Sequence, residues 1–108
     1  MAPLTSLDIS GNALSFIPPY ICYIMTLTYL SAAHNKLSFL PGFIQQLTQL
    51  RTLDVSFNML TMLPNEIMQL VHLNELNLSG NVFKGLPSPV FALRTLTVLA
   101  VSAIRVRT

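Results

Sequence analysis

The sequence contains few charged residues and only one cysteine. Of its 108 residues, 9% are charged, against roughly one quarter in typical soluble domains, whereas 52% are hydrophobic. This excess indicates that some apolar surface stays uncovered by the chain itself. The single cysteine, Cys22, excludes an internal disulfide framework, so we expect a buried thiol in a protein of a reducing compartment.

Clustered basic residues and an uninterrupted apolar run are also missing. Six Lys and Arg residues against four Asp and Glu give a net charge of +2, which is too small for the basic field that nucleic-acid phosphates require. The apolar stretch from Phe16 to Leu30 is broken by Pro18 and Pro19 and is shorter than the roughly 20 residues of a transmembrane helix. The first residues lack the basic flank and apolar run of a secretory signal. We therefore expect no nucleic-acid partner, no membrane span and a cytoplasmic location.

Residue patterns that support catalysis or metal binding are absent from the sequence. His34, His72 and Cys22 do not follow a metal-ligand spacing. No glycine-rich phosphate-binding motif occurs either. The sequence therefore predicts no catalytic residues, no metal, no cofactor and no enzymatic activity.

A repeat of 23 residues runs through the chain, marked by Leu4, Leu27, Leu50, Leu73 and Leu96. Each is followed three residues later by another leucine and then by an aliphatic or small residue, which is the alternation of a strand. An asparagine column follows, at Asn12, Asn35, Asn58 and Asn81, and is broken at Ile104. A proline column comes next, at Pro18, Pro41, Pro64 and Pro87, where we expect a return segment to begin. Such in-phase columns predict stacked coils that share one continuous core.

The segment Leu50–His72, LRTLDVSFNMLTMLPNEIMQLVH, resembles one whole leucine-rich repeat of the pattern LxxLxLxxNxLxxLPxxIxxLxx. Four such copies (4–26, 27–49, 50–72 and 73–95) and a partial fifth (96–108) make one domain over residues 1–108. The resemblance implies an α/β solenoid with a short curved parallel β-sheet on its concave side and with loops, 3-10 or short helical turns on its convex side. It also implies that the four column asparagines form a ladder to the backbones of their own and adjacent coils.

The LPxxIxxL form of the repeat is similar to that of intracellular scaffolds such as the Ras suppressor, scribble and Erbin group. This similarity implies a protein partner in signalling, such as a small GTPase or a phosphatase.

The predicted concave face offers a candidate surface for such a partner. The second, third, fifth, seventh and eighth residues of each copy should point away from the core and carry no structural role. From these we select Asp8, Tyr29, Ser31, His34, Arg51, Asp54, Phe57, Glu75 and Asn77 as partner-binding residues. Three of the four acidic residues lie in this set against a single arginine, whereas Lys36, Lys84, Arg94, Arg105 and Arg107 lie elsewhere. The alternative is that the carboxylates only keep the sheet soluble.

A second candidate surface is apolar and lies on the outer side of the first copies. It holds Phe16, Phe39, Met62, Tyr20, Phe43, Cys22, Tyr23 and Met25. We expect a neighbouring repeat or cap of a longer protein to cover it, because both ends of the repeat series lack polar caps. Self-association through uncapped ends is a further expectation.

We therefore expect an intracellular scaffold or adaptor that binds a protein partner on its concave sheet. One alternative is a targeting or sensor region of a larger enzyme, such as a ubiquitin ligase, kinase or cyclase. Another is a truncated fragment without independent function.

Overall fold

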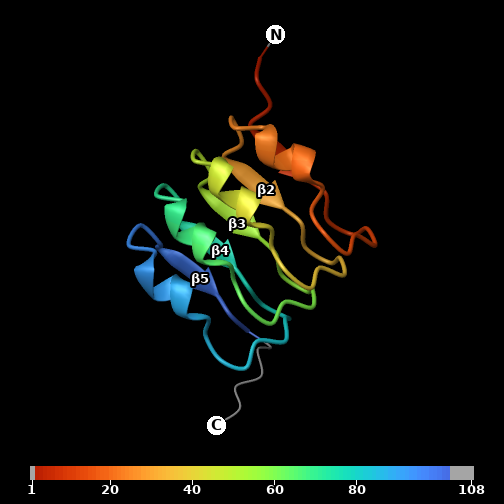
Figure 1. Ribbon diagram of the computed structural model, residues 1–108, viewed down its shortest axis with the longest axis vertical. Coiled ribbons are helices and arrows are strands. Elements are labelled where there is room, and N and C mark those ends of the chain that lie inside the picture. The colour runs from red at the N-terminus through yellow and green to blue at the C-terminus, as the bar shows by residue number, and fades with distance from the viewer. Residues whose placement is uncertain (1, 103–108) are drawn as a thin grey trace.

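The computed structural model describes residues 2–102 as a stack of similar coils. Each coil has a three-residue strand, and the first four coils also have a five-residue 3-10 helix (Figure 1). The strands are β1 (Ser6–Asp8), β2 (Tyr29–Ser31), β3 (Thr52–Asp54), β4 (Glu75–Asn77) and β5 (Val98–Ala100). The 3-10 helices are η1 (Pro19–Tyr23), η2 (Gly42–Gln46), η3 (Asn65–Gln69) and η4 (Ser88–Ala92). Ile104, Arg105 and Arg107 lie outside the described residues.

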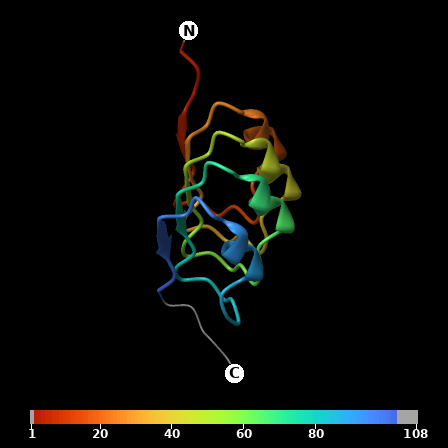
Figure 2. The same ribbon diagram turned by 90° about the vertical axis from the view of Figure 1, so that its left-hand side faces the viewer.

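The five strands form one parallel sheet in the order of the sequence, β1-β2-β3-β4-β5. Neighbouring strands pair with a constant offset, so that Leu7 is opposite Leu30 and Leu30 is opposite Leu53. The sheet occupies one side of the stack and the 3-10 helices the other (Figure 2). The predicted solenoid, with a parallel sheet on one side and 3-10 turns on the other, is confirmed. We call the outward-pointing side of the five strands the sheet face.

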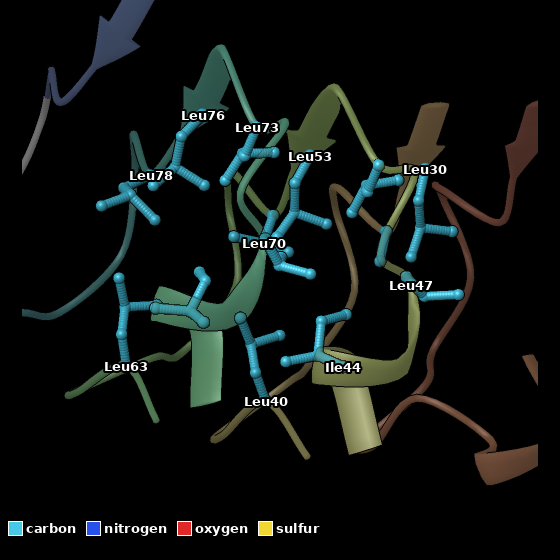
Figure 3. Close-up of a cluster of buried hydrophobic side chains, with 14 of the residues drawn as sticks. Leu30, Leu40, Ile44, Leu47, Leu53, Leu63, Leu70, Leu73, Leu76 and Leu78 are labelled. Atoms are coloured by element: carbon cyan, nitrogen blue, oxygen red, sulfur yellow. The ribbon is translucent and has the colours of Figure 1, made fainter. Parts of the chain in front are cut away.

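The core lies between these two sides. The central leucines of the strands, such as Leu53, point inward and meet Ile44 and Leu47 from the opposite side of the stack (Figure 3). These side chains are fully buried, and each such burial stabilises the fold by roughly 1.5–3 kcal/mol. Core residues of the first and last coils, Leu7 and Leu99 among them, are only partly buried because a neighbouring coil covers them on one side alone.

The proline column begins each 3-10 helix. Pro41 has φ −71° and ψ 150°, an extended conformation that its ring favours. Its carbonyl accepts a hydrogen bond from the N–H of Ile44 at 3.1 Å, and Leu47 N–H donates to Ile44 O at the same distance. These bonds between residues three apart define the tight turn that places Ile44 in the core. The three other prolines of the column occupy the same place before η1, η3 and η4.

Candidate binding surface on the sheet face

An asparagine ladder joins the coils at the end of the sheet. The side-chain N–H groups of Asn58 donate to Ala32 O, Val55 O and Ser56 O at 3.0–3.1 Å. Its Oδ1 accepts the backbone N–H of Leu37 at 3.0 Å. Asn35 and Asn81 make equivalent bonds. These amides are buried and tie each coil to the preceding one, which gives the sheet face a rigid support.

Asn12 differs from the other three column asparagines. It is exposed, and its amide donates only to Ile9 O at 2.9 Å and to Ser10 O at 3.3 Å, both within its own coil. The expected bonds to an adjacent coil are not formed by Asn12, because it lies in the first coil of the described stack.

The acidic and amide residues at the fifth position of the repeat have a structural role. Oδ1 of Asp8, Asp54 and Asn77 accepts the backbone N–H two residues later, at 2.9, 3.0 and 3.1 Å. Such bonds end a strand by turning the backbone. The hydroxyl and the backbone N–H of Ser10 lower the pKa of Asp8 below its ordinary value. The prediction that these positions carry no structural role is therefore wrong.

The eighth position is constrained as well. Gly11, His34, Phe57 and Gly80 all have positive φ, between 55° and 70°, a region that disfavours residues with a side chain. The rings of His34 and Phe57 stack with their centroids 4.6 Å apart and their planes 9° from parallel. The Phe57 ring lies over Gly80, where a Cβ would come within 2.4 Å of it. The two exposed rings thus form a stacked aromatic pair just beyond the ends of β2 and β3.

The seventh position does not point away from the core as expected. Ala33, Ser56 and Ser79 are buried, because each strand ends two residues earlier and the left-handed residue that follows redirects the chain. Ser31, at the fifth position, is also only 4% exposed. The structure contradicts its assignment to the exposed partner-binding set, since its side chain offers almost no surface.

A hollow of about 280 Å³ lies on the sheet face across β2 to β5. Among the predicted residues, Tyr29, Asp54, Glu75 and Asn77 line it together. Asp8, His34, Arg51 and Phe57 are not part of its lining. Val98 and Ala100, which were not among the predicted residues, also line it, as do Thr52, Leu53 and Leu76. Val98 and Ala100 stand at the third and fifth positions of the partial fifth copy, so the repeat pattern itself could have identified them.

A family model described as leucine rich repeat matches residues 2–60 and again residues 26–83. The chain belongs to the leucine-rich repeat family. Members of this family commonly mediate protein–protein interactions through the extended surface of the stack. A search of curated proteins found no match to the chain.

Solved leucine-rich repeat structures resemble the chain over most of its length. A leucine-rich repeat protein of Leptospira interrogans is 35% identical with a TM-score of 0.89, over 97% of this chain and 27% of that chain. An internalin of Listeria monocytogenes, 21% identical, has a TM-score of 0.81 over 95% of this chain and 29% of that chain. The plant peptide hormone receptor RGFR1 in complex with RGF2 is 26% identical with a TM-score of 0.79, over 95% of this chain and 17% of that chain. The chain thus spans between 17% and 29% of these proteins' lengths.

The outer side of this leucine-rich repeat chain carries exposed apolar residues. Phe16, Tyr20, Tyr23, Met25, Phe39, Phe43 and Met62 are 49–70% exposed. Cys22, which the sequence analysis grouped with them, is instead fully buried, as expected of a lone small thiol. Burial raises the pKa of the Cys22 thiol.

Residues 2–102 contain no group of three His, Cys, Asp or Glu side chains placed to hold a metal ion. Every helix in this range is too short to cross a bilayer.

Proposed function

We propose that this leucine-rich repeat chain is a protein-interaction module that binds a protein partner on its sheet face. The observation that supports this proposal is the hollow, which gathers Tyr29, Asp54, Glu75 and Asn77 from three adjacent strands. The buried asparagine ladder and the continuous core hold these strands in place, so little conformational freedom is lost on binding. RGFR1, 26% identical to this chain, forms a complex with RGF2.

The proposal extends to the cellular role. From the similarity of the LPxxIxxL repeat to the Ras suppressor, scribble and Erbin group, we propose an intracellular scaffold or adaptor in signalling, with a small GTPase or a phosphatase as the partner. We also propose that residues 1–108 form one domain whose ends lack polar caps. Leu4, in the first coil, is 48% exposed, and Leu99, in the last, is only partly buried; stacking of a further repeat or of a second copy would cover them.

A photo-crosslinking experiment tests whether the sheet face is the binding surface. Benzoylphenylalanine replaces Tyr29 on the sheet face or, as a matched aromatic control, Phe43 on the outer side, which is 49% exposed. We expect protein adducts from position 29 in cells and none from position 43. The charge reversal Asp54→Lys should abolish the adducts. Adducts from position 43 alone, or equal yields from both positions, contradict the proposal.

A further inference from the structure

The hollow on the sheet face has an aromatic, an acidic and an aliphatic part, with the neutral polar residues Thr52 and Asn77 also in its lining. Tyr29 provides an aromatic wall on β2, and Val98 and Ala100 provide an aliphatic wall on β5. Between them stand the carboxylates of Asp54 on β3 and Glu75 on β4. The volume of about 280 Å³ is enough space for one long side chain.

The two carboxylates are neighbours on adjacent strands. Thr52 is opposite Glu75 and Asp54 is opposite Asn77 in the register of β3 and β4, so Asp54 and Glu75 lie diagonally on the same face. The two residues are offset by one strand spacing of about 4.8 Å and by two residues of about 3.3 Å each, so their Cα atoms lie roughly 8 Å apart. A single planar cation placed between the strands therefore reaches both carboxylates.

Both carboxylates have oxygens available for a ligand. In the described chain, the bonds from Ser56 N–H at 3.0 Å and Ser56 Oγ at 2.6 Å both go to Oδ1 of Asp54. Neither of these bonds uses its Oδ2, and Glu75 is exposed to solvent. The residues of the five strands include three carboxylates, Asp8, Asp54 and Glu75, and no Lys or Arg, and Arg51 directly precedes β3. The charge of the sheet face is thus complementary to a cation.

We propose that the hollow binds the side chain of an arginine presented by the partner protein. Arginine combines an aliphatic stem, which suits Val98 and Ala100, with a flat cation that stacks on an aromatic ring such as Tyr29 and pairs with carboxylates in a fixed geometry. Lysine carries a compact, strongly hydrated charge and lacks the planar fork. This inference rests on the proposed function and assigns the chemistry of the group that the sheet face recognises.

Three short peptides distinguish the contributions of charge and shape. Acetyl-Gly-Arg-Gly-amide, its lysine counterpart and its citrulline counterpart, which is flat but uncharged, are titrated into the full chain and followed by amide NMR shifts. We expect the arginine peptide to shift the amides of β3 and β4 and to bind about fivefold more tightly than either other peptide. Equal affinities, or shifts confined to other coils, overturn the proposal.

Conservative charge removal tests the two carboxylates. Asp54→Asn keeps the acceptor for Ser56 N–H, since Asn77 makes the same bond to Ser79 one coil later at 3.1 Å, so the fold should survive. We expect Asp54→Asn and Glu75→Gln each to weaken binding of the arginine peptide by about threefold to fivefold. The matched control is Glu66→Gln, which removes a carboxylate from η3 on the outer side. An equal loss in Glu66→Gln would mean unspecific attraction and would refute the assignment.

The outcomes separate this inference from the proposed function. Failure of the arginine peptide together with persistent adducts from position 29 removes the arginine assignment and leaves the sheet face as the binding surface. Failure of both experiments removes both.

Discussion

The substitution Asn58→Ala tests the energetic role of the asparagine ladder. Asn58 is 6% exposed and makes four hydrogen bonds, three as a donor and one as an acceptor. Each of the three carbonyl oxygens that accept from Asn58 also accepts a hydrogen bond from another donor. Ala32 O also accepts from Asn35 at 3.1 Å, Val55 O from Asn81 at 2.9 Å, and Ser56 O from the N–H of His34 at 2.9 Å.

The main loss falls on one backbone group. In the described residues, Leu37 N–H donates to Asn58 Oδ1 at 3.0 Å. Alanine at position 58 would leave this N–H without that acceptor, and Leu37 is fully buried. An unpaired buried donor costs about 1–3 kcal/mol. The three carbonyl oxygens add a smaller cost, because each loses one hydrogen bond and keeps another. We therefore expect Asn58→Ala to lower the free energy of unfolding by about 2–4 kcal/mol in total.

Urea unfolding followed by circular dichroism measures this loss. For a small domain the expected change lowers the urea midpoint by roughly 1–2 M. The control is Asn12→Ala, which removes an exposed amide that bonds only within its own coil. Water can replace those bonds, so we expect a cost below about 0.5 kcal/mol. Hydrogen exchange at the Leu37 amide should accelerate in Asn58→Ala more than at core amides of β4.

Two results would refute this reasoning. The first is a midpoint for Asn58→Ala within error of the unsubstituted chain. The second is an equal destabilisation by Asn12→Ala, which would show that the amide's burial and its bonds between coils are irrelevant.

Three further predictions concern the left-handed column, the first strand and the thiol. Gly11→Ala should cost about 1 kcal/mol for its positive φ alone, whereas Gly80→Ala should cost more because its Cβ would meet the Phe57 ring at 2.4 Å; thermal melts should show the excess disappear when Phe57→Ala is added. Because the pKa of Asp8 is lowered, its ionised carboxylate stabilises the fold above the ordinary pKa of 3.8, and this stabilisation is lost as the pH falls. Between about pH 5 and 2, the melting temperature of Asp8→Asn should therefore drop less than that of the unsubstituted chain. The buried Cys22 thiol, with its raised pKa, should react with a disulfide reagent at neutral pH far more slowly than free cysteine and at an ordinary rate in urea; equal rates in the folded chain would contradict its burial.

Much of the fold could be predicted because each repeat column has one physical cause. Leucines at fixed intervals identify the core, as at Leu53. The proline column marks the start of each 3-10 helix, as at Pro41. Val98 and Ala100 were not predicted as part of the hollow, although they occupy the third and fifth positions of the partial fifth copy.

The candidate surface was predicted less completely. Strand alternation assigned Ser31 to the exposed set and gave Asp54 no structural role, yet Ser31 is buried and Asp54 binds Ser56. Alternation describes a continuing strand, whereas these strands are three residues long and end in a hydrogen-bonded turn. The exposure of a residue at such a turn depends on the backbone path that follows.

By itself the sequence determined which leucines face the core, how the coils stack and where each turns, because these features recur every 23 residues. Tertiary structure decided what depends on two coils at once. Gly11 and Gly80 share a column and nearly the same φ, yet only Gly80 lies beneath the ring of Phe57. The hollow likewise exists only where side chains of different strands meet at the same height on the sheet face.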